Sequence, residues 1–200
     1  MAACTGSPIT IGTGSPRTRS AVLTRFANAA ALLLAVTAWS APVNAQALPP
    51  PPNMVPITER LTSSGQPSAA WLETLGARGY EAVIYLAPLT VGDAIPDEPQ
   101  ILARQSIDFV HIPIAFNQPT AADFDSFAAA MTRFADKKVL VHCQINMRAS
   151  SMVFLYRTIV GKEDPQVAFA SVEKVWTPNG VWKAFMQAQL QQHGVVFDFF

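Results

Sequence analysis

The sequence predicts an α/β fold with a largely parallel central sheet flanked by helices. Short apolar runs at residues 82–86 and 139–142 are typical of strands buried on both faces. Segments with apolar residues at helical spacing lie between such runs, as in βαβ units. Half of the 200 residues are hydrophobic and only 14% are charged, which excludes an intrinsically disordered chain.

The predicted elements alternate from about residue 57. Strands are expected at residues 60–64, 82–86, 109–114 and 139–142, the first of them an edge strand. Helices are expected at residues 68–79, 99–106, 120–138, 148–160, 165–176 and 181–191. Aromatic residues at helical spacing, such as Phe124 and Phe127, are expected to be core. The aromatic segment 195–200 is expected to form a closing strand because of its β-propensity, with a partner-binding segment as the alternative.

The first 45 residues have the pattern of an export signal. A basic stretch without acidic residues (17–25) is followed by a short apolar run (29–39). Val43 and Ala45 then form an A-x-A-like cleavage pattern. A membrane anchor is the alternative, but a bilayer span needs about 20 apolar residues. We therefore expect a signal peptide over residues 1–45 and an exported protein, periplasmic or secreted.

Residues 46–56 follow the predicted cleavage site and are rich in proline. Four consecutive prolines favour an extended polyproline II conformation. We expect this stretch to be a semi-rigid tether and residues 57–200 to form a single domain. Removal of the signal also removes Cys4, so that Cys143 is the remaining cysteine. Because a free thiol is a chemical liability in an oxidising compartment, Cys143 calls for a functional explanation.

Charge and hydropathy bear on the partners. The 14 basic and 14 acidic residues cancel, so the sequence lacks the basic excess typical of nucleic-acid binding. No segment after the predicted signal is long and apolar enough to cross a bilayer. We expect no nucleic-acid partner and no stable membrane span after signal cleavage.

The main chemical motif lies where the predicted strand 139–142 ends, and ligands of parallel sheets bind at such ends. Cys143 comes directly after the strand, and Arg148 lies in the first turn of the next helix. Loop amides and the positive end of a helix bind oxyanions and favour the thiolate form of a cysteine. Arginine holds a tetrahedral oxyanion with two parallel hydrogen bonds. We therefore predict that Cys143 and Arg148 are catalytic. The predicted substrate-binding residues are Gln144, Ile145, Asn146, Met147 and Arg148.

Neighbouring residues have supporting roles in this prediction. His142 either orients the loop through its ring N–H groups or is a core histidine, and the sequence leaves both open. Asn146 is the loop residue that best accepts a positive φ. Ser150 and Ser151 are candidates to assist the sulfur leaving group. A metal site is not expected, because His142 and Cys143 lack further ligands at useful spacing.

The block VLVHCQINMRAS, residues 139–150, resembles the phosphate-binding loop of cysteine-dependent protein tyrosine and dual-specificity phosphatases. With residues 64–68 and 82–86, it is similar to a bacterial branch related to the beta-lactamase-hydrolase-like phosphatase-like domain, over residues 57–192. The resemblance implies a three-layer architecture and hydrolysis of a phosphomonoester, on a protein or a small molecule. It implies that Cys143 forms a phosphocysteine while Arg148 and the loop amides hold the oxygens, without metal or organic cofactor.

The sequence departs from the usual phosphatase pattern in several ways. Four residues rather than five separate Cys143 from Arg148, the loop has no glycine, and Ala149 replaces the usual serine or threonine. The resemblance also suggests an aspartic acid in the loop after the second strand, where residues 115–119 contain none. Asp123 and Asp125 are the nearest candidates for the general acid. Their place in the first turn of a helix is more typical of residues that compensate the helix dipole.

Two other functions remain open at this point. A six-residue loop that includes Cys143 and Arg148 is similar to that of rhodanese-type sulfurtransferases, in which the thiolate carries a persulfide. A loop that binds an oxyanion or a phosphorylated ligand without turnover is the non-enzymatic alternative. A persulfide on Cys143, or binding without turnover, would select one of these over the expected phosphatase.

Overall fold

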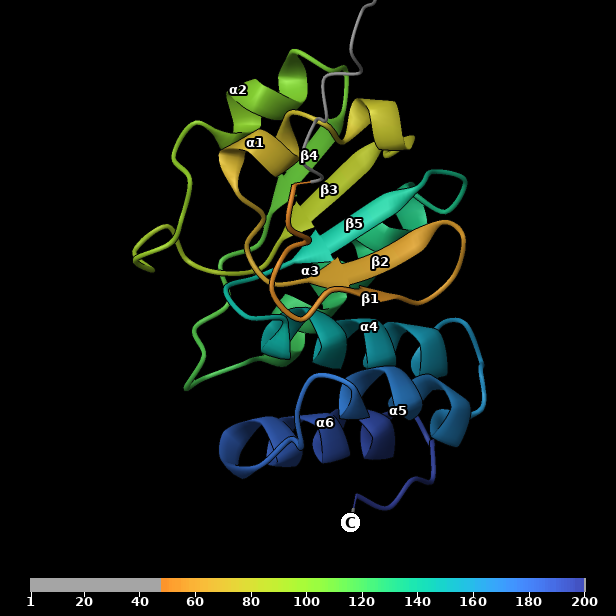
Figure 1. Cartoon of the computed structure of the whole chain (residues 1–200). Helices are drawn as coiled ribbons and strands as arrows, with labels where there is room; N and C mark the ends of the chain where they lie inside the picture. The colour runs from red at the N-terminus through yellow and green to blue at the C-terminus, as the bar shows by residue number, and fades with distance from the viewer. Residues whose placement is uncertain (1–47, 200) are drawn as a thin grey trace, which may run out of the picture. The chain divides into compact units, whose positions relative to one another are not determined.

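A five-stranded sheet with helices on both faces organises residues 48–199, the part of the chain that the computed structural model describes (Figure 1). The predicted signal peptide lies outside the described residues. The strand order is β1-β2-β5-β3-β4. β1 (Val55–Pro56) pairs antiparallel with β2 (Leu61–Ser64), and every other pair is parallel. The predicted fold class is thus confirmed, although β2 lies inside the sheet and not at its edge.

The central strands are the apolar runs of the sequence. β3 (Ala82–Tyr85) and β5 (Val139–His142) are buried along their whole length, as strands covered on both faces must be. β4 (Asp108–His111) forms the far edge. The register places the last residues of the parallel strands side by side, with Ser64 opposite His142 and Tyr85 opposite both His142 and His111. These strand ends therefore meet at one edge of the sheet.

Two helical layers cover the sheet, which gives the expected three-layer architecture (Figure 1). One layer contains α1 (Ala69–Leu72), a 3-10 helix (Gly76–Arg78) and α2 (Glu98–Ala103). The other contains α3 (Ala121–Arg133), α4 (Met147–Ile159), α5 (Pro165–Glu173) and α6 (Gly180–Gln192). None of the helices within residues 48–199 is long and apolar enough to cross a membrane.

Each layer closes its own apolar core against the sheet. The larger core lies under α3 to α6 and includes Phe124 and Phe127, which are buried as their helical spacing predicts. The smaller core lies under α1 and α2 and includes Trp71 and Leu102. Cys143 belongs to the larger core. The nucleophile candidate is therefore a buried member of this apolar core.

Part of the predicted tether is in contact with the domain. The carbonyl of Pro52 accepts a hydrogen bond of 2.7 Å from the amide of Gly65, directly after β2. Val55 is buried and forms β1 with Pro56. Val55 and Pro56, which follow the run of prolines in the sequence, therefore add an outer strand to the sheet.

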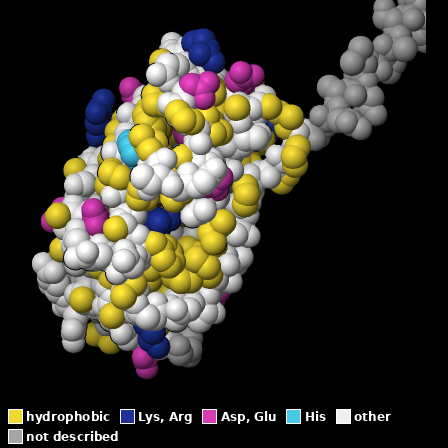
Figure 2. All heavy atoms as spheres, turned by 90° about the vertical axis from the view of Figure 1, so that its left-hand side faces the viewer, with side chains coloured by type: hydrophobic (Ala, Val, Ile, Leu, Met, Phe, Trp, Pro, Cys, Tyr) yellow, Lys and Arg dark blue, Asp and Glu magenta, His cyan; other side chains and the backbone are white. Residues whose placement is uncertain are grey.

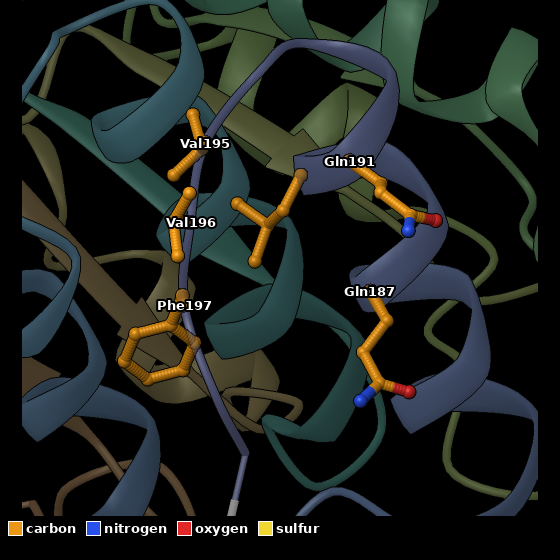
Figure 3. Close-up of a pocket in the computed structure, with 6 residues that line it drawn as sticks. Gln187, Gln191, Val195, Val196 and Phe197 are labelled. Atoms are coloured by element: carbon orange, nitrogen blue, oxygen red, sulfur yellow. The ribbon is translucent and has the colours of Figure 1, made fainter.

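The aromatic C-terminal segment packs on the domain but does not form the expected strand. Val195 to Phe197 run back along α6 and line a hollow of about 440 Å³ with Gln187 and Gln191 (Figure 3). The rings of Phe197 and Phe199 contact those of Phe154 and Phe169, with centroids 5.0 to 6.1 Å apart. The β-propensity of this segment thus reflects aromatic side chains that fill the space beside α4 and α5.

Candidate active site

The turn from β5 into α4 brings the predicted site residues together. Asn146 has a φ of 72°, as its ability to accept a left-handed conformation predicts. Its side chain is buried, and its Nδ2 donates to the carbonyl of Asn53 at 2.6 Å and to Ser63 Oγ at 3.1 Å. Because the Asn146 side chain points into the domain, it makes no capping bond to α4.

The absence of a side-chain cap leaves amide donors at the start of α4. Helix N-termini carry N–H groups without intrahelical partners, and a capping side chain usually takes one of them. Here the amide of Ser150 donates to the Asn146 carbonyl at 2.9 Å. The preceding amides, those of Met147, Arg148 and Ala149, have no backbone acceptor within residues 48–199. They form a group of donors suited to an oxyanion.

Arg148 is held in place beside these amides. Its Nε donates to the carbonyl of Ile114 at 3.0 Å, and its guanidinium carbon lies 5.0 Å from the ring centre of Phe116. The side chain is almost entirely buried. Its two terminal amino groups have no hydrogen-bond partner among the described residues. A guanidinium fixed in this way can place two parallel donors on one ligand.

Cys143 is the first residue of the loop, directly after β5. It is a free cysteine, it is fully buried, and its amide donates to the Ser64 carbonyl at 3.2 Å. A hollow of about 260 Å³ opens over the loop and is lined by Phe116, Gln144, Ile145, Met147 and Arg148. Figure 2 views the side toward which the parallel strands point in Figure 1, and shows a small basic spot near its centre between hydrophobic and white surface. All the predicted substrate-binding residues except Asn146 line this hollow.

A buried polar network lies behind the loop. His142 Nε2 is 2.7 Å from Glu98 Oε1, and the second carboxylate oxygen of Glu98 accepts from Gln66 Nε2 at 3.0 Å. The His142 ring stacks on Tyr85, which in turn stacks on His111. Of the two roles left open for His142, this network favours orientation of the loop. Glu98 could not be predicted as a site residue from the sequence, because a glutamate before a proline at a helix start is typical of dipole compensation.

Tyr85 adds a hydroxyl group to this region. Burial raises the pKa of Tyr85 to about 12, and the negative charges of Glu98 and Asp93 add to the effect. The hydroxyl group is buried without a hydrogen-bond partner in residues 48–199. Tyr85 therefore stays protonated at any physiological pH and is a potential donor.

The remaining predicted residues lie outside the hollow. Asp123 caps α3: its Oδ2 accepts from both the amide and the hydroxyl of Thr120 at 2.8 Å. Asp125 is exposed on the same helix. The Ser150 hydroxyl donates to the Met147 carbonyl at 3.2 Å, and Ser151 is buried with no partner for its hydroxyl in the described chain. Capping of α3 therefore accounts for the position of Asp123.

The parallel sheet and the Cys–loop–Arg turn at its carboxyl edge together define a domain of the tyrosine and dual-specificity phosphatase class. The chain matches the family described as "DSP-PTPase phosphatase fused to NAD+ Kinase" over residues 55–189. It belongs to this family.

Similar proteins agree with this assignment. Two crystal structures of a phosphatase-family protein from Shewanella putrefaciens CN-32 are 29% and 30% identical, with TM-scores of 0.64 and 0.63. They align with 71% of this chain and with 93% and 88% of their own. The "Beta-lactamase hydrolase-like protein" of Xylella fastidiosa is 32% identical over 112 residues, which are 54% of this chain and 26% of that protein. The chain thus spans about a quarter of the length of the curated relatives that it matches.

The loop is supported by residues that directly follow β2. Gly65 forms an isolated bridge with Ile145, and the amide of Gln66 donates to the Gln144 carbonyl at 3.0 Å. A Cβ atom on Gly65 would lie 2.8 Å from the Gln144 carbonyl oxygen and 3.0 Å from that of Pro52. Only glycine therefore allows this close approach of three backbone segments.

Substitution of Gly65 is expected to disturb both stability and the loop. Gly65→Ala should lower the free energy of unfolding by about 1–3 kcal/mol, because the backbone must move to admit the methyl group. Urea denaturation followed by tryptophan fluorescence measures the change. Gly92→Ala is the matched control, since a Cβ there meets nothing within 4 Å. Equal stability of the two variants would contradict this account of Gly65.

Proposed function

We propose that this protein hydrolyses phosphomonoesters through a phosphocysteine formed on Cys143. Its family is one of phosphatases, which supports a phosphoric monoester hydrolase. The observation that carries the cysteine mechanism is the uncapped start of α4, whose free amides and Arg148 follow Cys143 in the same short loop. A cysteine next to a cluster of oxyanion donors is suited to nucleophilic attack on a phosphoryl group.

The reaction proceeds in two displacement steps. In the first, the Cys143 thiolate forms an S–P bond while the ester P–O bond breaks and the leaving group departs with the electron pair. In the second, water forms a new P–O bond, the S–P bond breaks, and Cys143 is regenerated as inorganic phosphate leaves. The terminal amino groups of Arg148 and the amides of α4 hold the phosphoryl oxygens in both steps.

Substitution of the two principal residues tests this mechanism. Cys143→Ser should reduce p-nitrophenyl phosphate hydrolysis to background, because a neutral hydroxyl is a far weaker nucleophile than a thiolate. Arg148→Ala should lower kcat/KM by on the order of 10²–10³-fold, as expected for loss of an oxyanion donor. The reduced protein, residues 46–200, is assayed by nitrophenolate release. Exposed Arg104→Ala serves as the control, and full activity of Cys143→Ser would refute the phosphocysteine.

The lining of the hollow supports an aryl phosphate as substrate. Phe116 and Ile145 are 39% and 43% exposed, and Arg148 is the one charged residue of the lining. Aromatic surface binds an aryl group, whereas a polyphosphorylated ligand requires additional cations. No carboxylic acid lines the hollow, and a positioned general acid is typically worth about 10²–10⁴-fold in rate. Leaving groups that depart without a proton should therefore react best.

A comparison of substrates tests this preference. We expect kcat/KM for p-nitrophenyl phosphate and phosphotyrosine to exceed kcat/KM for phosphoserine and glycerol phosphate by at least about tenfold. This is a conservative figure, because a positioned general acid is typically worth about 10²-fold or more in rate. Phe116→Ala should raise KM for the aryl substrates more than for the alkyl ones. Leu89→Ala, which removes an exposed side chain outside the hollow, is the control. Equal rates for aryl and alkyl esters would rule out the preference.

We further propose that the protein acts after export, periplasmic or secreted, on the basis of the sequence pattern in residues 1–45. Expression of the full chain in bacteria should yield a soluble protein whose intact mass lacks these residues. Leu33→Arg, which interrupts the apolar run, should keep the full mass and remain inside the cell. Recovery of the uncleaved wild-type chain in the membrane fraction would support an anchor instead.

A further inference from the structure

Glu98 is a buried carboxylate that the proposed reaction does not use directly. It is the first residue of α2, and it is 1% exposed. Burial of a carboxylate is unfavourable unless hydrogen bonds compensate the lost hydration, so buried acidic groups are rarely retained without partners. The position of Glu98 at the start of a helix does not require burial, because a dipole-compensating residue acts equally well at the surface.

The two partners of Glu98 lead to the two sides of Cys143. One carboxylate oxygen lies 2.7 Å from Nε2 of His142, the residue immediately before Cys143. The other accepts from Nε2 of Gln66, whose own amide donates to the carbonyl of Gln144, the residue immediately after Cys143. One side chain from the opposite helical layer thus connects to the chain both before and after the nucleophile.

The contact with Glu98 also bears on the tautomer of the His142 ring. A bond to the ionised form of Glu98 places a proton on His142 Nε2, because an ionised carboxylate can only accept. Stacking on Tyr85, with ring centroids 4.6 Å apart and planes 16° apart, restricts rotation of the imidazole. The orientation of His142, and with it the last residue of β5, therefore depends on Glu98.

We propose that Glu98 is a positioning residue, which aligns Cys143 and the oxyanion-binding amides by holding His142 and Gln66 together. This inference rests on the proposed function, because alignment matters for turnover at Cys143. Glu98 acts through its two partners, and its contribution is hydrogen bonding. A displacement of about 1 Å in a reacting group costs on the order of 100-fold in rate, so loss of such a link should be visible in kcat.

Two substitutions separate hydrogen bonding from the presence of a charge. Glu98→Gln can keep both links. Its side-chain carbonyl oxygen accepts from His142, and its side-chain NH2 donates to Gln66 Oε1 once the Gln66 amide turns by 180°, since Gln66 Nε2 is the atom that faces Glu98 in the native protein. Glu98→Leu removes both links at similar volume. Glu73→Gln, on an exposed glutamate that follows α1, is the matched control.

The first readout is steady-state kinetics with p-nitrophenyl phosphate. Glu98→Leu should lower kcat by on the order of 10–100-fold with a smaller change in KM, whereas Glu98→Gln should stay within about threefold of wild type. Wild-type kcat in Glu98→Leu would overturn the proposal, and so would an equal loss in Glu98→Gln. If circular dichroism shows that Glu98→Leu is unfolded, Gln66→Leu replaces it. That variant breaks one link and should lower kcat, and an unchanged kcat would then overturn the proposal.

The second readout does not depend on turnover. Nitrogen-15 NMR of the imidazole rings should show a protonated Nε2 on His142 in wild type and in Glu98→Gln, and an altered ring signal in Glu98→Leu. The chain has 3 histidines, so single substitutions assign the signal. An unchanged His142 signal in Glu98→Leu would overturn the proposal. A wild-type protein with the expected signal but without phosphatase activity would refute the proposed function alone.

Discussion

The left-handed backbone of Asn146 is the constraint on which the site depends. The chain must leave a buried strand and enter a helix within four residues, and a positive φ at the last of them makes this turn. For a residue other than glycine this conformation costs about 1–2 kcal/mol. Hydrogen bonds from the Asn146 side chain to Asn53 and Ser63 offset that cost. The same bonds take the side chain away from α4, whose first amides are left for a ligand.

The loop between Cys143 and Arg148 derives its shape from segments that are distant in the sequence. Asn53 and Gly65 contact it from the side of β1 and β2, and the Ile114 carbonyl holds Arg148 from the end of β4. Parallel register makes this convergence possible, because the carboxyl ends of neighbouring strands lie at the same level. A loop that is short and has no glycine is thus given its conformation by its neighbours.

The two faces of the sheet offer the site different environments. Residues alternate between the faces along a strand, so Cys143 faces the apolar core under α3 to α6, while His142 faces α2. The His142 ring, which stacks on Tyr85, and the carboxylate of Glu98 lie in hydrogen-bond contact on the α2 side. The apolar side excludes water from beneath the thiol, and the polar side orients the backbone that carries it. Neither face could supply both conditions.

Local patterns predicted most of the secondary structure because its causes are local. Ser68 and Thr120 cap helices where their spacing from apolar residues indicates, and the buried runs form β3 and β5. The C-terminal segment was predicted wrongly as a strand. The apolar side chains of this segment indicate that it is buried, but they pack against residues of the helices α4 and α5. Within residues 48–199, no edge strand of the sheet pairs with this segment.

The sequence by itself determined the fold class, the phosphatase resemblance and the candidate pair Cys143 and Arg148. This was possible because the reactive residues of a strand–loop–helix turn lie within a few positions of one another in the sequence. It also identified Asn146 as the residue with a positive φ. The tertiary structure alone brought Glu98, Gly65 and Phe116 to the loop, although they lie tens of residues from it in the sequence. Register and helix packing set such contacts, and a glutamate at a helix start has the same local pattern whether that helix faces solvent or covers the sheet.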